Sequence, residues 1–104
     1  MKTNRSIRHS RPIQEVFGGE PYEYYPLGRY IVSAPGVCGG RPTFKYTRLE
    51  VSVILSLIAV GDSIQEVVES YSASHITPEA VREAIELANQ ALLHSTQTLH
   101  PEPV

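Results

Sequence analysis

The ten-residue run VSVILSLIAV, residues 51–60, constrains the fold of this 104-residue chain more than any other stretch. Its apolar side chains would lie on nearly all sides of a helix, with only Ser52 and Ser56 forming a polar stripe. Such a helix is usually central to a core or partly buried in a subunit interface. The run is also much shorter than the roughly 20 residues that a membrane-spanning helix needs. We therefore expect a soluble protein built around this helix.

Helix start signals follow one another through the second half of the chain. Three hydroxyl residues stand where helix N-caps are expected: Thr47, Ser63 and Thr77. Thr47 and Ser63 are each followed three residues later by Glu, which is the spacing of a capping box. Thr77 is followed directly by Pro78, which suits the first position of a helix. These signals predict helices over about residues 49–60, 63–71 and 78–93. The last helix carries one apolar stripe at three- and four-residue steps.

The turn-rich segment SAPGVCGGRP, residues 33–42, separates two short runs rich in aromatic and β-branched residues. We expect these runs, RYIV and TFKY, to pair as a β-hairpin over about residues 29–46. A lone hairpin is marginal in water, so this one must pack against the helices. The predicted fold is mainly α, a three-helix bundle preceded by a short β-hairpin. We assign residues 1–21 to a flexible basic arm, 22–94 to a single domain and 95–104 to a disordered tail.

Cys38 is the only cysteine, which excludes an intrachain disulfide and fits a reducing compartment such as the cytoplasm. A catalytic thiol at this position would need a nearby cation or histidine, for which Arg41 and His75 are the candidates. The four histidines show no metal-ligand spacing, and the glycine-rich segment lacks the Lys-Ser/Thr ending of a phosphate-binding P-loop. We therefore expect no catalytic residue, no metal and no cofactor. The residues CGGRP are expected to form a structural turn: Cys38, Gly39, Gly40 and Pro42.

The charges are divided unevenly along the chain. Residues 1–48 hold eight Lys/Arg against three Glu, and residues 49–104 hold one Arg against eight Asp/Glu. A basic half can meet an anionic partner, although a solvated tail beside an acidic body is the commoner arrangement. The outer, solvated face of the third helix has three Glu (Glu79, Glu83 and Glu86) against one Arg and would repel DNA phosphates. The candidates for partner or nucleic-acid contact are Arg41, Lys45, Arg48, Arg82 and Asn89.

The run IVSAPGVCGGRPTFKYTRLEVSVILSLIAVGDSIQEVVESY resembles the domain of unknown function 433 family. That family's pattern is a strand, a CGG turn followed by Lys or Arg and Pro, and Gly-Thr-Arg before the first helix. The segment ITPEAVREAIELAN is similar to its third helix, so the resemblance covers roughly residues 28–93. Tyr46 stands where the family usually has Gly, and the turn SASHIT lacks the family's usual Pro.

The resemblance implies a homeodomain-like, helix-turn-helix bundle with a β-hairpin before it. It also implies an antitoxin that binds a PIN-like nuclease toxin and, as a further ligand, its own operator DNA. Two alternatives stay open: a structural protein that homodimerises without binding DNA, and a thiol enzyme that uses Cys38. The apolar first helix and the exposed edges of the hairpin favour a homodimer.

Overall fold

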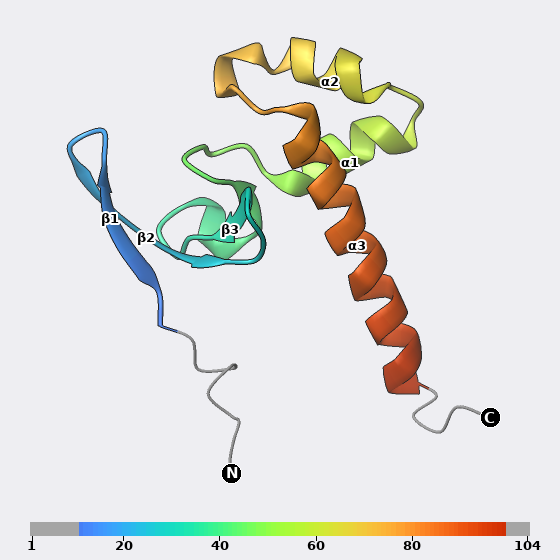
Figure 1. The fold of residues 1–104 in the computed structure, drawn as a ribbon, viewed down its shortest axis with the longest axis horizontal. Helices are drawn as coiled ribbons and strands as arrows, with labels where there is room; N and C mark the ends of the chain where they lie inside the picture. The colour runs from blue at the N-terminus through green and yellow to red at the C-terminus, as the bar shows by residue number, and fades with distance from the viewer. Residues whose placement is uncertain (1–10, 100–104) are drawn as a thin grey trace.

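The computed structural model describes residues 11–99, which form a β-sheet followed by three helices (Figure 1). The strands are β1 (Ile13–Phe17), β2 (Glu20–Pro26), β3 (Ile31–Ser33) and β4 (Thr43–Phe44). The helices are α1 (Val51–Ala59), α2 (Ile64–Ser70) and α3 (Pro78–Leu99), with short 3-10 turns at Cys38–Gly40 and Ser72–Ser74. The three predicted helices are therefore present, and their starts lie within two residues of the predicted positions.

The prediction of a mainly α fold is wrong, because the four strands form one antiparallel sheet in the order β1-β2-β3-β4. The predicted hairpin makes up half of this sheet, where Ile31 pairs with Phe44 and Val32 with Thr43. The other half is a ribbon of β1 and β2, which we call the β1–β2 ribbon.

The β1–β2 ribbon occupies residues that the sequence analysis assigned partly to a flexible arm. Its two strands are joined by Gly18 and Gly19, which have φ of +62° and +80°. Positive φ at both central residues is the geometry of a type I′ hairpin turn, and Gly-Gly between two apolar runs is a known signal for it. The predicted arm at residues 1–10 and the predicted tail at residues 100–104 lie outside the described residues.

The long helix α3 extends to Leu99, into the segment that was predicted to be a disordered tail. Three hydroxyl side chains in its last turns donate to the carbonyl oxygen four residues earlier: Ser95, Thr96 and Thr98. These hydrogen bonds satisfy the hydroxyls within the helix, which continues through this polar segment. Within residues 11–99, none of the helices has the length and apolarity to span a bilayer.

Two of the three predicted helix caps are formed. Ser63 and Glu66 make both hydrogen bonds of a capping box, and Thr77 accepts a backbone N–H in the first turn of α3. Thr47 does not cap α1, because its hydroxyl bonds within the turn that follows β4. The N-cap position of α1 is Glu50, whose side chain makes no capping hydrogen bond.

One hydrophobic core joins the β3–β4 hairpin to all three helices. Its buried residues are Ile31, Phe44, Val51, Ile54, Val67, Ile76, Ala80, Val81 and Ala84. A smaller buried cluster of Tyr24, Val32 and Ala34 lies apart from it, at β2 and β3. Among the described residues, β1 contributes to neither cluster. The β1–β2 ribbon is therefore attached to the body through β2, by its pairing with β3 and by the small cluster around Tyr24, and not through the main core.

Candidate interaction surface

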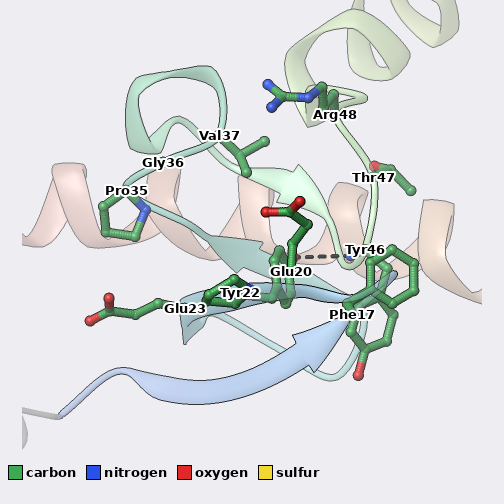
Figure 2. A pocket seen from close by; sticks show the side chains of 11 residues that line it. Phe17, Glu20, Tyr22, Glu23, Pro35, Gly36, Val37, Tyr46, Thr47 and Arg48 are labelled. Atoms are coloured by element: carbon green, nitrogen blue, oxygen red, sulfur yellow. Dashed lines mark hydrogen bonds between the residues drawn. The ribbon is translucent and has the colours of Figure 1, made fainter.

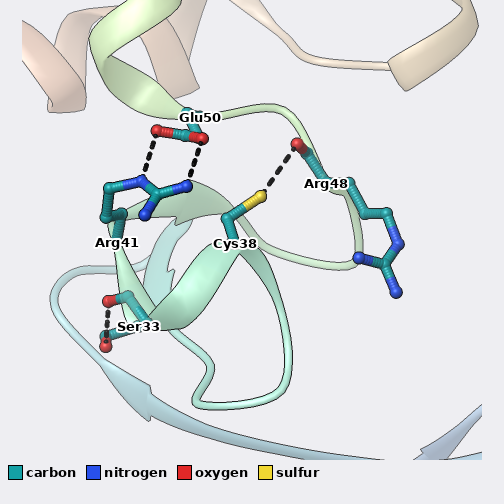
Figure 3. A network of polar contacts seen from close by, with 6 residues as sticks. Ser33, Cys38, Arg41, Arg48 and Glu50 are labelled. Atoms are coloured by element: carbon teal, nitrogen blue, oxygen red, sulfur yellow. Dashed lines mark hydrogen bonds and ion pairs between the residues drawn. The ribbon is translucent and has the colours of Figure 1, made fainter.

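The CGG segment is a left-handed turn between β3 and β4. Cys38, Gly39 and Gly40 have φ of +51°, +65° and +84°, a region that favours glycine. The Ser33 hydroxyl donates to the Gly40 carbonyl at 2.6 Å, and the Cys38 thiol donates to the carbonyl of Arg48 at 3.4 Å (Figure 3). The two glycines thus supply backbone freedom, and the cysteine ties the turn to the connection that leads into α1.

Arg41 and Pro42 link the same turn to the start of α1. The Arg41 guanidinium donates to both carboxylate oxygens of Glu50, at 3.0 and 3.1 Å (Figure 3). These hydrogen bonds lower the pKa of the Glu50 carboxyl and raise the pKa of Arg41. The Pro42 carbonyl accepts the N–H of Val51 at 2.9 Å. Arg41 is therefore held in an intramolecular ion pair, although its side chain is 64% exposed.

An open groove of about 560 Å³ lies between the β1–β2 ribbon and the loop at residues 35–37 (Figure 2). We call it the aromatic groove, and its principal lining residues are Phe17, Tyr22, Val37, Tyr46 and Arg48. Glu20 and Glu23 also line it. The groove therefore combines exposed aromatic surface with charges of both signs.

Tyr46 organises the aromatic groove. Its ring stacks on Phe17 with centroids 4.7 Å apart, and its backbone N–H donates to the Tyr22 hydroxyl at 3.0 Å (Figure 2). Its own hydroxyl donates to a carboxylate oxygen of Glu15 at 2.8 Å. Tyr46 has a φ of +68°, which is uncommon for a residue other than glycine. Tyr46 thus holds the β1–β2 ribbon against the body.

Lys45 belongs to the same network. Its Nζ lies 4.9 Å from the ring centroid of Tyr24 and 5.0 Å from that of Tyr46. The interaction with the Tyr24 side chain raises the pKa of Lys45. Tyr24 in turn donates its hydroxyl to Glu15 at 2.9 Å, and the hydrogen bonds from Tyr46 and Tyr24 lower the pKa of the Glu15 carboxyl. Lys45 thus contributes to attachment of the ribbon.

The structure does not bring the five predicted contact residues into one cluster. Arg41 and Lys45 are engaged as described above, and Arg48 is exposed beside the aromatic groove. Arg82 lies on α3 against the α2 side of the body, and Asn89 is exposed farther along α3. A contact role for any of the five stays a prediction, and Arg48 is the exposed cation among them that lines the aromatic groove.

Sequence reasoning missed Phe17 and Tyr22, and it assigned Glu83 to a solvated helix face. The Gly-Gly turn signal could have placed both aromatics on the ribbon. Glu83 has a structural role instead, because its carboxylate accepts the backbone N–H groups of Arg29 and Tyr30 at 2.8 and 2.7 Å. No local sequence signal indicates that contact, which spans more than 50 residues of the chain.

Comparison with known proteins identifies a family. A family model described as protein of unknown function (DUF433) matches residues 31–88. The matched segment runs from the start of β3 into α3, and so includes the CGG turn, α1 and α2 but not the β1–β2 ribbon. No curated protein and no solved structure matches the chain.

Proposed function

Because the chain belongs to the DUF433 family, whose function is unknown, we propose that it is a non-enzymatic binding module, an antitoxin-like partner of a PIN-like nuclease. The aromatic groove is the observation that carries this proposal. It places Phe17, Tyr22 and Tyr46 beside the exposed Arg48. Aromatic and arginine side chains are enriched at protein–protein interfaces and among the residues that contribute most to their affinity.

The charge of the described residues favours a protein partner over DNA. Residues 11–99 hold six Lys/Arg against ten Asp/Glu, and Glu20 and Glu23 line the groove itself. Nucleic-acid phosphates would be repelled by such a surface. Operator DNA is therefore the second ligand to test, with Arg48 and Arg82 as the exposed cations that would contact it.

Binding through the groove can inhibit a nuclease without any chemistry by this chain. The Arg48 guanidinium is free to bind a carboxylate bidentately, since its side chain is exposed and the described contacts use only its carbonyl. Carboxylates are the groups that hold Mg²⁺ in phosphate-processing sites. We infer that Arg48 engages an acidic residue of the toxin while Phe17 and Tyr22 pack against apolar surface beside it.

The test uses the full chain and the PIN-like nuclease encoded by the neighbouring gene. Titration calorimetry measures their affinity, and cleavage of a single-stranded RNA measures inhibition. We expect Phe17→Ala and Arg48→Ala each to weaken binding about tenfold or more, as loss of a central interface side chain does. Arg82→Ala is the matched control, because it removes an exposed arginine outside the groove. This variant should bind the nuclease with the same affinity as the parent protein.

Three outcomes would refute the proposal. In the first, the nuclease remains fully active when this protein is in excess. In the second, no gene for a PIN-like nuclease lies beside the gene for this protein. The groove variants could also bind as tightly as the Arg82→Ala control, which would exclude the groove as the binding surface. Mobility shift of the upstream duplex at low salt tests DNA in parallel. A shift without any nuclease binding would replace the protein partner by DNA.

A further inference from the structure

The C-terminal half of α3, residues 88–99, is not covered by any other part of residues 11–99. All twelve residues are exposed, and in Figure 1 this half of the helix extends past the rest of the body. Leu92, Leu93 and Leu99 are 67%, 56% and 76% exposed. An isolated helix of this length is marginal in water, so packing against another surface is the expected source of its stability.

The apolar residues of α3 continue from the core into this exposed half at coiled-coil spacing. Steps of four and three residues alternate along the stripe Val81, Ile85, Ala88, Leu92, Ser95 and Leu99. Val81 is fully buried in the core, whereas Ile85 is 37% exposed and the later members are exposed. Alternating steps of this kind form the seam by which two helices pack. We call residues 85, 88, 92, 95 and 99 the α3 seam.

We propose that the α3 seam binds the α3 seam of a second copy of this chain in antiparallel orientation, about a two-fold axis at Leu92. Ile85, Leu92 and Leu99 are spaced by seven residues on either side of that axis. The two-fold therefore places Ile85 of each copy against Leu99 of the other, and Leu92 against Leu92. The spacing of these three large side chains is self-complementary, as a two-fold interface requires, while Ala88 and Ser95 lie opposite Thr96 and Asn89.

The charge pattern of α3 supports this orientation. Residues 87–99 contain no Asp, Glu, Lys or Arg. In the paired segment, residues 85–99 of each copy, the one charged residue is Glu86, and it would face the neutral Thr98. Antiparallel pairing also places the acidic first turns, with Glu79 and Glu83, at opposite ends of the pair. A parallel pair would bring these carboxylates close to their symmetry mates, where like charges repel.

The same pattern argues against two other occupants. A helix that lies on a membrane surface typically carries Lys and Arg on its polar face, and this half of α3 has neither. Complementary charges give specificity for a different protein, and the α3 seam carries none. The inference is independent of the proposed nuclease partner, because the seam shares no residue with the aromatic groove.

The experiment measures the mass of the purified full chain by sedimentation over a range of concentrations. We expect a dimer whose dissociation constant rises at least about 30-fold in Leu92→Asp, since two carboxylates then face each other across the axis. The matched control is Leu93→Asp, the same change one residue along on a side of the helix outside the seam, and it should dimerise like the parent. Thermal unfolding confirms that both variants keep the folded body.

Crosslinking tests the orientation of the pair. With Cys38→Ser as background, a single cysteine at Leu92→Cys should form an intermolecular disulfide, whereas one at Ile85→Cys should not. A parallel pair would crosslink at both positions and would overturn the orientation. The proposal would be overturned if the chain remained monomeric at about 1 mM. It would also be overturned if Leu92→Asp and Leu93→Asp changed the dissociation constant equally, or if the monomer sedimented with anionic phospholipid vesicles.

Discussion

Thr43 is a fully buried residue whose hydroxyl has no hydrogen-bond partner among the described residues. It lies on β4 opposite Val32. An unsatisfied buried hydroxyl costs about 1–3 kcal/mol of stability. Thr43→Val keeps the branched shape, so we expect its free energy of unfolding to rise by about 1 kcal/mol, measured by urea unfolding.

A matched control separates the buried hydroxyl from the general effect of exchanging threonine for valine. The Thr47 hydroxyl donates to the Phe44 carbonyl at 2.7 Å and accepts the Leu49 N–H at 3.0 Å. Thr47→Val should therefore lose about 1 kcal/mol, the opposite sign. If Thr43→Val also loses stability, the Thr43 hydroxyl has a partner such as a buried water.

The contacts of Tyr46 could not be predicted from the sequence. Its left-handed backbone, with a φ of +68°, costs about 1–2 kcal/mol for a residue with a Cβ. The contacts of its side chain with Phe17, Glu15 and Lys45 offset that cost. The neighbouring residues along the chain could identify the turn, but only the fold reveals that Phe17 and Glu15 return to meet this side chain.

The helices were predictable because their signals are local. Ser63 with Glu66 and Thr77 with Pro78 act within a single helical turn, so the sequence around them is sufficient. The Thr47 signal failed because its hydroxyl found a nearer backbone partner in the turn after β4. β1 and its pairing with β2 were missed although the Gly-Gly turn between them is also local, and the position of the ribbon against Tyr46 depends on contacts 24 and 31 residues apart.

Glu83 connects α3 to the loop between β2 and β3. Its two oxygens accept the N–H groups of Arg29 and Tyr30. Glu83→Ala removes both acceptors, and we expect it to lower the free energy of unfolding by about 2 kcal/mol. Glu83→Gln retains one acceptor oxygen and should lose less. Chemical unfolding followed by circular dichroism measures all three proteins.

Glu86→Ala is the control for Glu83, because Glu86 is an exposed carboxylate on the same helix. Its one described contact is a hydrogen bond from Gln90 within α3. Its effect should stay within about 0.5 kcal/mol. Equal losses for Glu83→Ala and Glu86→Ala would contradict the role of Glu83, since removal of any helix carboxylate would then have the same effect.

The two surfaces that we propose for binding both extend beyond the family match. Phe17 and Tyr22 precede residue 31, and Leu92 and Leu99 follow residue 88. The matched segment contains the whole of the main core, from Ile31 to Ala84. In this chain the shared segment therefore accounts for the stable body, while the β1–β2 ribbon and the end of α3 carry seven of the twelve large apolar side chains that are exposed among the described residues. Specificity for a partner is consequently not readable from the family alone.

The attachment of the β1–β2 ribbon should depend on pH. Hydrogen bonds from Tyr46 and then Tyr24 lower the pKa of Glu15 below its ordinary value of 4.5. A lowered pKa in the folded state means that the stabilisation is present above pH 4.5 and is lost as pH falls through the folded-state pKa. The hydrogen bond from Arg41 lowers the pKa of Glu50 in the same direction. We therefore expect the melting temperature to fall between pH 7 and pH 3.

The variants Glu15→Gln and Glu50→Gln test how much of this acid sensitivity comes from each of the two carboxyl groups. Each variant should melt below the parent at pH 7 and should lose less on acidification, because one titrating group is gone. In Glu15→Gln, amide signals of the β1–β2 ribbon should change with pH less than in the parent, while those near Arg41 should change as before. A parent-like pH profile in both variants would show that other carboxylates control acid stability. The Glu15 network would then hold the ribbon through neutral contacts, chiefly the stacking of Phe17 on Tyr46.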